Sequence, residues 1–271
     1  MACTVHPASA TDYAIFARLF VELAVPEPTP SEERFASLIA PDALIARVDG
    51  EIAGYAWART RGDALHVVHV VTDPAFRRRG VGEGLMNAMA ALARERGHTR
   101  WMLNVKPDNL AARALYERCG LRVVFESASV RLRWADLSRV APAEVVAADA
   151  RIARVDPTED SRFERDLGLL PNEIAAARKL DRIVVGAEAG GRALGILALD
   201  PPFPGASPVR VKTPGVARVL LEAVREAARP DRDHLFVFAE GHPALVDALV
   251  EAGGEIALSA LRMEGDVPNA R

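Results

Sequence analysis

Hydrophobic positions in the first half of the chain alternate between helical and strand-like spacing. Apolar residues recur at helical intervals within residues 11–23, which predicts a helix there, and the same periodicity favours helices near Ser31, at 82–96 and at 109–118. Strands are predicted at residues 43–48, 52–58, 66–72, 101–105 and 121–134. This alternation predicts an α/β fold, an α+β arrangement on a mixed sheet.

The second half repeats this order of elements. A shift of 134 residues places Tyr116 on Val250 and the predicted strand 101–105 on residues 235–239. We interpret the match as an internal duplication into domains 1–140 and 150–271, joined by a weakly patterned linker. The alternative is that two unrelated α/β halves of similar size would align equally well.

A turn rich in glycine and arginine connects the predicted strand 66–72 to the predicted helix 82–96. Gly80 and Gly82 allow the backbone to approach a bulky anion, and the positive end of the helix dipole points the same way. The segment therefore predicts a pyrophosphate site. The alternative is a purely structural turn with three solvated arginines.

Two motifs in this region resemble those of a known family. Arg77-x-x-Gly80-x-Gly82, preceded by Val71-Thr72-Asp73-Pro74, is similar to the acyl-CoA pyrophosphate loop of the GNAT superfamily of N-acetyltransferases. Residues 103–121, with Asn109, Tyr116 and Gly120, resemble that superfamily's second CoA-contacting motif. The clear resemblance covers residues 43–134 and implies two GNAT-like domains in tandem, with acetyl-CoA as co-substrate.

The resemblance also implies which residues contact acetyl-CoA. The backbone of Val70, Val71 and Thr72 is expected to pair with the pantetheine arm at a bulge in the strand. The pyrophosphate is expected to meet the amides of Arg78, Arg79, Gly80, Val81, Gly82 and Glu83, with Arg77 supporting the turn. Asn109 is expected to contact the pantetheine or, alternatively, only to cap its helix.

Tyr116 is the expected general acid, which would return a proton to the departing thiolate. The alternative is a tyrosine that only packs in the core. The base is left open between His66 and His69, because Asn104 stands where some relatives carry a glutamate. Strict alternation puts the two histidines on opposite faces unless a bulge falls between them, and either could be a packing residue. Cys119 is expected to pack at the end of its helix.

The second half lacks this machinery in the same alignment. Pro214 falls on Gly80 and removes an amide donor, Val216 falls on Gly82, and Val250 replaces Tyr116. Domain 150–271 is therefore expected to be a degenerate, non-catalytic copy with a structural role or a role in the substrate cleft.

Composition narrows the function classes. The formal net charge of -3 and the pI of about 6.1 argue against a nucleic-acid partner. Two cysteines fit a reducing compartment and exclude a cysteine-based zinc site, and no metal is expected. The chain shows neither a signal-peptide pattern nor a run of about 18 apolar residues. These features predict a cytoplasmic protein with no membrane partner.

Together these features predict an enzyme, an acetyl-CoA-dependent N-acetyltransferase that transfers directly to a primary amine in a ternary complex. The acceptor is left open between a small-molecule amine and a protein or peptide amine, and a homodimer is also left open. The alternative is a non-catalytic acyl-CoA-binding sensor or an interaction protein.

Overall fold

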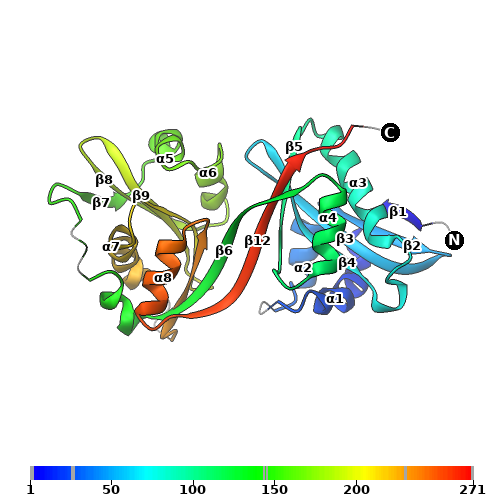
Figure 1. The fold of residues 1–271 in the computed structure, drawn as a ribbon, viewed down its shortest axis with the longest axis horizontal. Coiled ribbons are helices and arrows are strands. Elements are labelled where there is room, and N and C mark those ends of the chain that lie inside the picture. Colours follow the sequence, from blue (N-terminus) through cyan, green and yellow to red (C-terminus); the bar gives the residue numbers. More distant parts are fainter. Residues whose placement is uncertain (1–2, 26–27, 143, 145, 229–230, 270–271) are drawn as a thin grey trace. The chain divides into compact units, whose positions relative to one another are not determined.

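The computed structural model describes residues 3–25, 28–142, 144, 146–228 and 231–269, which fall into two compact units. Unit 1 comprises residues 1–124 and 262–271, and unit 2 comprises residues 125–261. This division differs from the expected linear one into 1–140 and 150–271. The difference lies in two long strands, β6 (Arg122–Arg133) and β12 (Glu255–Asp266), each of which begins in one unit and ends in the other (Figure 1).

The sheet of unit 1 has the strand order β1-β2-β3-β4-β5-β12. The first four strands form antiparallel pairs, and β4 then pairs with β5 in parallel. The strands are β1 (Cys3–Pro7), β2 (Ala43–Val48), β3 (Glu51–Arg61), β4 (Ala64–Thr72) and β5 (Arg100–Val105). The last strand of the chain thus completes the sheet of the unit that contains the first.

Helices cover both faces of this sheet. They are α1 (Tyr13–Phe20), α2 (Glu32–Arg34), α3 (Val81–Glu95) and α4 (Leu110–Arg118). Adjacent residues of β3 face different helices: a Cβ at Gly54 would lie 3.2 Å from Val81 of α3, whereas Tyr55 packs edge-on against Phe16 of α1. Since successive strand residues point to opposite faces, α1 and α3 lie on opposite sides of the sheet.

The helix predicted at residues 11–23 is shorter than expected. After α1 the chain tightens into the 3-10 turn Val21–Leu23, which ends at Ala24 with a left-handed φ of 47°. The helix predicted near Ser31 begins there, because the Ser31 hydroxyl caps it by accepting from the Arg34 amide, and then widens into the π-turn Phe35–Ile39. Phe16 stacks on Phe35, so both helical segments share one core.

Unit 2 repeats the order of elements of the first half, as the duplication predicts. The elements are β7 (Arg151–Arg154), α5 (Asp160–Leu167), α6 (Glu173–Arg178), β8 (Ile183–Ala189), β9 (Arg192–Asp200), β10 (Gly205–Val211), α7 (Pro214–Val224), β11 (His234–Glu240) and α8 (Pro243–Glu251). Its strand order is β6-β11-β10-β9-β8-β7, with β12 beside β6. No helix in the described part of either unit is long and apolar enough to cross a bilayer.

Candidate functional site

The sheet of unit 1 opens between β4 and β5. Their parallel pairing runs from Ala64 to Val67, whereas β4 continues to Thr72. On the other edge of β4, Ala58 pairs with Val67 and Trp57 pairs with His69, which leaves Val68 as an extra residue. This is the predicted bulge, and a bulge bends its strand away from a neighbour. The edge of residues 68–72 that faces β5 is therefore available to an extended ligand.

The turn between β4 and α3 combines left-handed residues with helical amides that have no partner within the helix. Arg78 and Gly80 have left-handed φ values of 65° and 77°, and alternation of this kind makes a concave nest of N–H groups. The first backbone bond of α3 runs from Gly84 to Gly80, so the three helical amides before Gly84 lack an intrahelical acceptor. The helix dipole adds positive potential at the same place.

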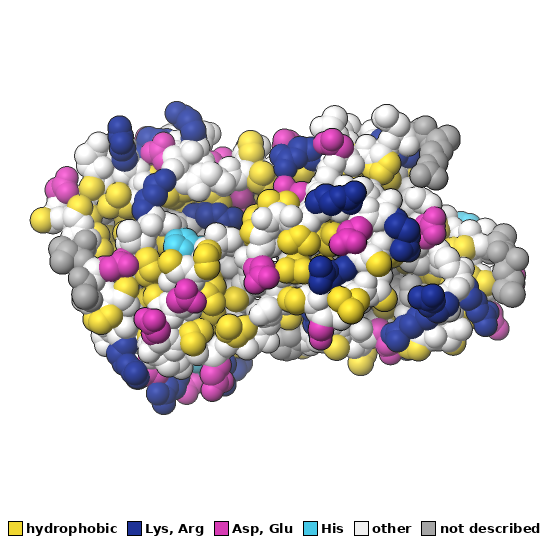
Figure 2. Space-filling model, in the orientation of Figure 1, with side chains coloured by type: hydrophobic (Ala, Val, Ile, Leu, Met, Phe, Trp, Pro, Cys, Tyr) yellow, Lys and Arg dark blue, Asp and Glu magenta, His cyan; other side chains and the backbone are white. Residues whose placement is uncertain are grey.

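Arginines surround this turn. The side chains of Arg77, Arg78 and Arg79 are exposed, and Arg79 lies over the ring of Phe76. Figure 2 shows further lysine and arginine side chains on the face of unit 1 that carries α4 in Figure 1, interspersed with acidic ones. The local charge thus suits an anion, although the net charge of the chain is negative.

Two ion pairs tie the turn to the α1 side of the sheet. Arg18 donates to Asp73 at 2.6 Å, and this bond, with a backbone bond from Ala75, holds the pKa of the Asp73 carboxyl below its usual range. Arg77 pairs with Glu22 at 2.8 Å. Arg77 therefore supports the turn from outside, by holding it to the segment that follows α1.

Gly82 lies where α3 approaches α4. A Cβ at this position would lie 2.9 Å from Leu115 Cδ2 and 3.8 Å from Thr72 Oγ1. The glycine thus permits close helix packing as well as close approach of a ligand. Asn109 caps α4 by accepting from the Ala112 amide at 3.1 Å, which is the capping role that the sequence left as an alternative.

Tyr116 is buried within α4, with 7% of its surface exposed. Burial, with a smaller contribution from Cys119, raises the pKa of its hydroxyl well above the usual value, so the phenol stays protonated at neutral pH. Burial also raises the pKa of the Cys119 thiol, which fits the expected packing role and disfavours a nucleophile.

The bulge at Val68 falls between the two histidines and brings both to one face. His66 pairs with Arg59 and His69 with Trp57, and these two partners lie two residues apart on β3. His69 hydrogen-bonds the Tyr55 hydroxyl at 3.2 Å and packs edge-on against Phe20. Burial, assisted by the charge of Arg59, lowers the pKa of His69 to about 4. His69 is thus neutral at pH 7 but a weak base.

Sequence reasoning missed a contact at Asn104. The guanidinium of Arg262, on β12, donates from Nε to Asn104 Oδ1 at 2.9 Å and reaches Met102 Sδ at 2.8 Å. Arg262 is 2% exposed. No sequence signal connects residues so far apart, because the contact depends on the last strand of the chain entering unit 1.

The equivalent opening in unit 2 is closed. Parallel pairing of β10 with β11 extends to Val209, two residues before β10 ends. Beyond it, Arg210 pairs with the buried Glu240 at 3.0 Å and also donates to the Glu240 carbonyl. The connection to α7 is only Lys212 and Thr213, so no extended turn forms.

A carboxylate of the linker occupies the N-terminus of α7. Glu144 Oε2 accepts from the Gly215 amide at 2.7 Å, and Arg218 donates to the carbonyls of Val140 and Ala141. The helix end that would attract an anion is therefore satisfied from within the chain. Residues 143 and 145 of the predicted linker lie outside the described residues.

The residues at which the helices begin show that the alignment of the two copies is displaced by one residue at α7 and α8. Gly215, not Val216, is the second residue of α7, as Gly82 is of α3. Leu249, fully buried, has the place of Tyr116 in α8, whereas Val250 is 41% exposed. The second copy thus keeps one glycine of the turn and still lacks a phenol.

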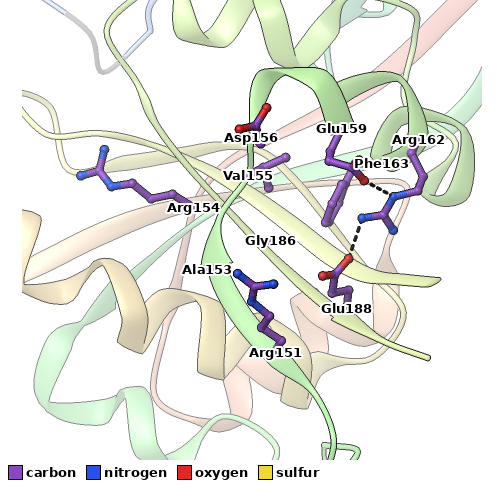
Figure 3. A pocket seen from close by; sticks show the side chains of 10 residues that line it. All are labelled: Arg151, Ala153, Arg154, Val155, Asp156, Glu159, Arg162, Phe163, Gly186 and Glu188. Atoms are coloured by element: carbon purple, nitrogen blue, oxygen red, sulfur yellow. Dashed lines mark hydrogen bonds and ion pairs between the residues drawn. The ribbon is translucent and has the colours of Figure 1, made fainter. Parts of the chain in front are cut away.

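A small cavity of about 120 Å³ lies in unit 2, among residues of β7, β8 and α5 (Figure 3). Arg162 bridges Glu159 and Glu188 across it, and Gly186 of β8 also lines it. None of the residues expected to contact acetyl-CoA lines this cavity. Among the described residues of the chain, no cluster of three or more His, Cys, Asp or Glu side chains could hold a metal ion.

Comparisons with known proteins agree with this geometry. A model of the acetyltransferase (GNAT) family matches residues 13–121. The ribosomal protein bS18-alanine N-acetyltransferase of Escherichia coli is 30% identical over 103 residues, which cover 37% of this chain and 67% of that enzyme. The chain belongs to the GNAT acetyltransferase family. A mycothiol acetyltransferase of Clavibacter sepedonicus is 40% identical over 80 residues, 29% of this chain and only 26% of that enzyme.

Several solved structures share the fold of this entire chain, and not only the fold of unit 1. A tandem GNAT protein from the clavulanic acid biosynthesis pathway has a TM-score of 0.61 and 18% identity, with 100% of both chains covered. A GCN5-related N-acetyltransferase from Sphaerobacter thermophilus has a TM-score of 0.68 and 16% identity, with 99% of this chain and 97% of that chain covered. The tandem fold is therefore shared well beyond the region of sequence similarity.

Proposed function

We propose that the protein is an acetyl-CoA-dependent N-acetyltransferase in which unit 1 is catalytic and unit 2 is not. One combination of features carries the proposal: the open edge of β4 at residues 68–72 leads directly into the amide nest before α3. The edge suits an amide-bearing arm and the nest suits a diphosphate, in the order in which acetyl-CoA carries them. When bound there, acetyl-CoA supplies an activated acetyl thioester.

Residues of unit 1 are proposed to orient the coenzyme arm, to protonate the sulfur and to accept the proton of the amine. Backbone groups of Val70, Val71 and Thr72 orient the arm and offer an amide to the thioester oxygen. The protonated Tyr116 hydroxyl donates to the sulfur as negative charge develops on it. The base stays a proposal between His66 and His69. The low pKa of His69 favours His66, which is 5% exposed on the same face.

The acceptor is a primary amine. Relatives named for mycothiol and for an alanine of ribosomal protein bS18 both match the chain, and the match to the former spans about a quarter of its length. Neither substrate is transferred to this chain, because function depends on the site rather than on the fold. We place the protein in the cytoplasm, which is consistent with the unpaired thiols of Cys3 and Cys119.

Thiol release from acetyl-CoA with a panel of amines tests the proposal. We expect turnover that depends on both an amine and Tyr116. Tight coenzyme binding without turnover on any amine would instead support the sensor alternative, and absence of coenzyme binding would support an interaction protein.

A further inference from the structure

Arg262 and Asn104 form a polar pair at the point where the sheet of unit 1 opens. Asn104 is the first residue of β5 beyond Leu103, the last that pairs with β4. Met102, two residues before Asn104, pairs with His66. Since strand residues two apart share a face, Asn104 lies on the face that carries both histidines and, farther along, α1.

The contact with Arg262 fixes which way the Asn104 amide is turned. A guanidinium has donors and no acceptor, so only the oxygen of the amide can face Arg262 Nε. The amide nitrogen, Nδ2, must then point the other way. Within the described part of the chain Nδ2 makes no hydrogen bond, and the side chain is only half-buried. Asn104 is thus presented as a donor.

Charges on this face disfavour a polycationic ligand. Arg59 is exposed there, and its charge contributes to the low pKa of His69. The carboxylate of Glu264 pairs with Arg100 at 2.8 Å and lies 3.8 Å from Arg262. The guanidinium groups of Arg100 and Arg262 thus both contact the single carboxylate of Glu264, which favours an acceptor that carries oxygen lone pairs.

The Asn104 amide is placed to contact the acceptor rather than the coenzyme. Strand side chains stand perpendicular to the sheet, whereas an arm that extends β4 pairs in the plane of the sheet. Tyr116 belongs to α4, which packs against α3 on the opposite face from α1. An acceptor that arrives on the histidine face therefore meets the side chain of Asn104 first.

We propose that Arg262 is a positioning residue that holds the Asn104 amide as a hydrogen-bond donor to a carbonyl or carboxylate oxygen next to the acceptor's amine. The acceptor class is then an α-amino carbonyl compound, not a simple alkylamine or a polyamine. This inference rests on the proposed function of unit 1, and it gives the last strand of the chain a part in substrate selection.

The test compares glycinamide with propylamine, which has a similar length and no oxygen. The measured quantity is the ratio of their kcat/KM values in each variant at one pH, so differences in amine basicity cancel. Asn104→Leu is expected to lower the glycinamide-to-propylamine ratio about tenfold, the effect of one lost hydrogen bond. Arg262→Met is expected to shift the ratio the same way, because the amide is no longer held.

Two controls separate positioning from folding. Arg262→Lys keeps a donor toward Asn104 and is expected to retain the ratio within about threefold. Asn87→Leu, on the exposed face of α3, is expected to leave it unchanged. A ratio that Asn104→Leu does not alter, or an equal loss with both amines, would overturn the inference alone. Absence of transfer by the wild type to any amine would overturn the proposed function and the inference with it.

Discussion

The turns before α3 and α7 occupy the same place in two copies of one fold, yet they differ in whether the first amides of the helix have a hydrogen-bond acceptor. Before α3, residues 73–80 form an extended turn with left-handed Arg78 and Gly80, and the helical amides before Gly84 lack an intrahelical acceptor. Before α7, two residues suffice, and the Glu144 carboxylate takes the Gly215 amide. The same contrast holds between the strands, since β4 loses its pairing with β5 after Val67, whereas β10 pairs again with β11 at Val209 after a register shift.

A binding site can thus be lost while the fold that carries it is retained. Unit 2 keeps the strands, the helix and even a glycine at the second helical position. It satisfies internally the groups that unit 1 offers to a ligand, through Glu144 at the helix and the Arg210–Glu240 pair at the strand end. Satisfying buried polar groups stabilises the copy and removes its capacity to bind.

The strongest way to break the contrast is to fill the turn of unit 1. Gly82→Val is expected to weaken acetyl-CoA binding on the order of 100-fold, because the side chain obstructs amides that make charge-assisted bonds to phosphate. Leu115 can move its Cδ2 atom aside, so the fold is expected to persist. Ligand-induced thermal shift measures the affinity, and circular dichroism checks the fold.

The matched variant in unit 2 is Gly215→Ala. It disturbs the contact with Glu144 and is expected to leave acetyl-CoA affinity unchanged. Equal losses in the two variants would mean that the two turns do not differ as described.

Removing the phenol that only unit 1 possesses separates chemistry from binding. Tyr116→Phe is expected to lower kcat about 100-fold, the usual contribution of a general acid, while acetyl-CoA affinity stays within about threefold. Tyr13→Phe, which removes a hydroxyl that donates to the Pro30 carbonyl, serves as the control. Steady-state thiol release measures both, and an unchanged kcat in Tyr116→Phe would remove that residue from the mechanism.

Acid is expected to lower the free energy of unfolding of unit 1, because His69 is buried in its neutral form. The imidazole binds a proton near pH 6.5 in the unfolded chain and only near pH 4 in the fold. Its contribution to stability is therefore fully present above about pH 6.5 and is lost as the pH falls toward 4, by up to about 1.4 kcal/mol per pH unit. Urea unfolding at several pH values measures this slope. In His69→Gln, which retains a partner for Tyr55, the slope should become shallower, and an unchanged slope would contradict the assignment.

The smallest expected effect concerns the carboxylate in unit 2. Glu144→Gln is expected to destabilise unit 2 by about 1 kcal/mol, the typical value of an anion at a helix N-terminus. It should not create a second coenzyme site, because β10 and β11 remain paired. Thermal unfolding compares it with Glu222→Gln, which changes an exposed residue near the other end of α7. Equal stabilities of the two variants would show that Glu144 contributes nothing there.

Sequence patterns predicted the elements of unit 1 well, because periodicity and turn residues are local signals. Residues 43–48 form β2 as predicted, and α3 and α4 each begin within one residue of the expected position. The bulge in β4 and the N-cap role of Asn109 were also anticipated as alternatives. The expected coenzyme contacts and catalytic roles remain predictions.

Contacts that depend on tertiary arrangement could not be read from the sequence. Glu144 lies in a segment without pattern, and Arg262 reaches Asn104 only because β12 enters unit 1. The alignment of the two copies was displaced by one residue at α7 and α8 although it holds at the start of β11, since one-residue differences between connecting turns leave no signal in a diverged sequence.

Calorimetric titration of the two-unit chain with acetyl-CoA decides whether unit 1 alone binds the coenzyme, because it counts the sites. One site per chain is expected, with an affinity that Gly82→Val lowers on the order of 100-fold and Gly215→Ala leaves unchanged. Two sites per chain, or a single site whose affinity Gly82→Val leaves unchanged and Gly215→Ala lowers, would contradict this expectation.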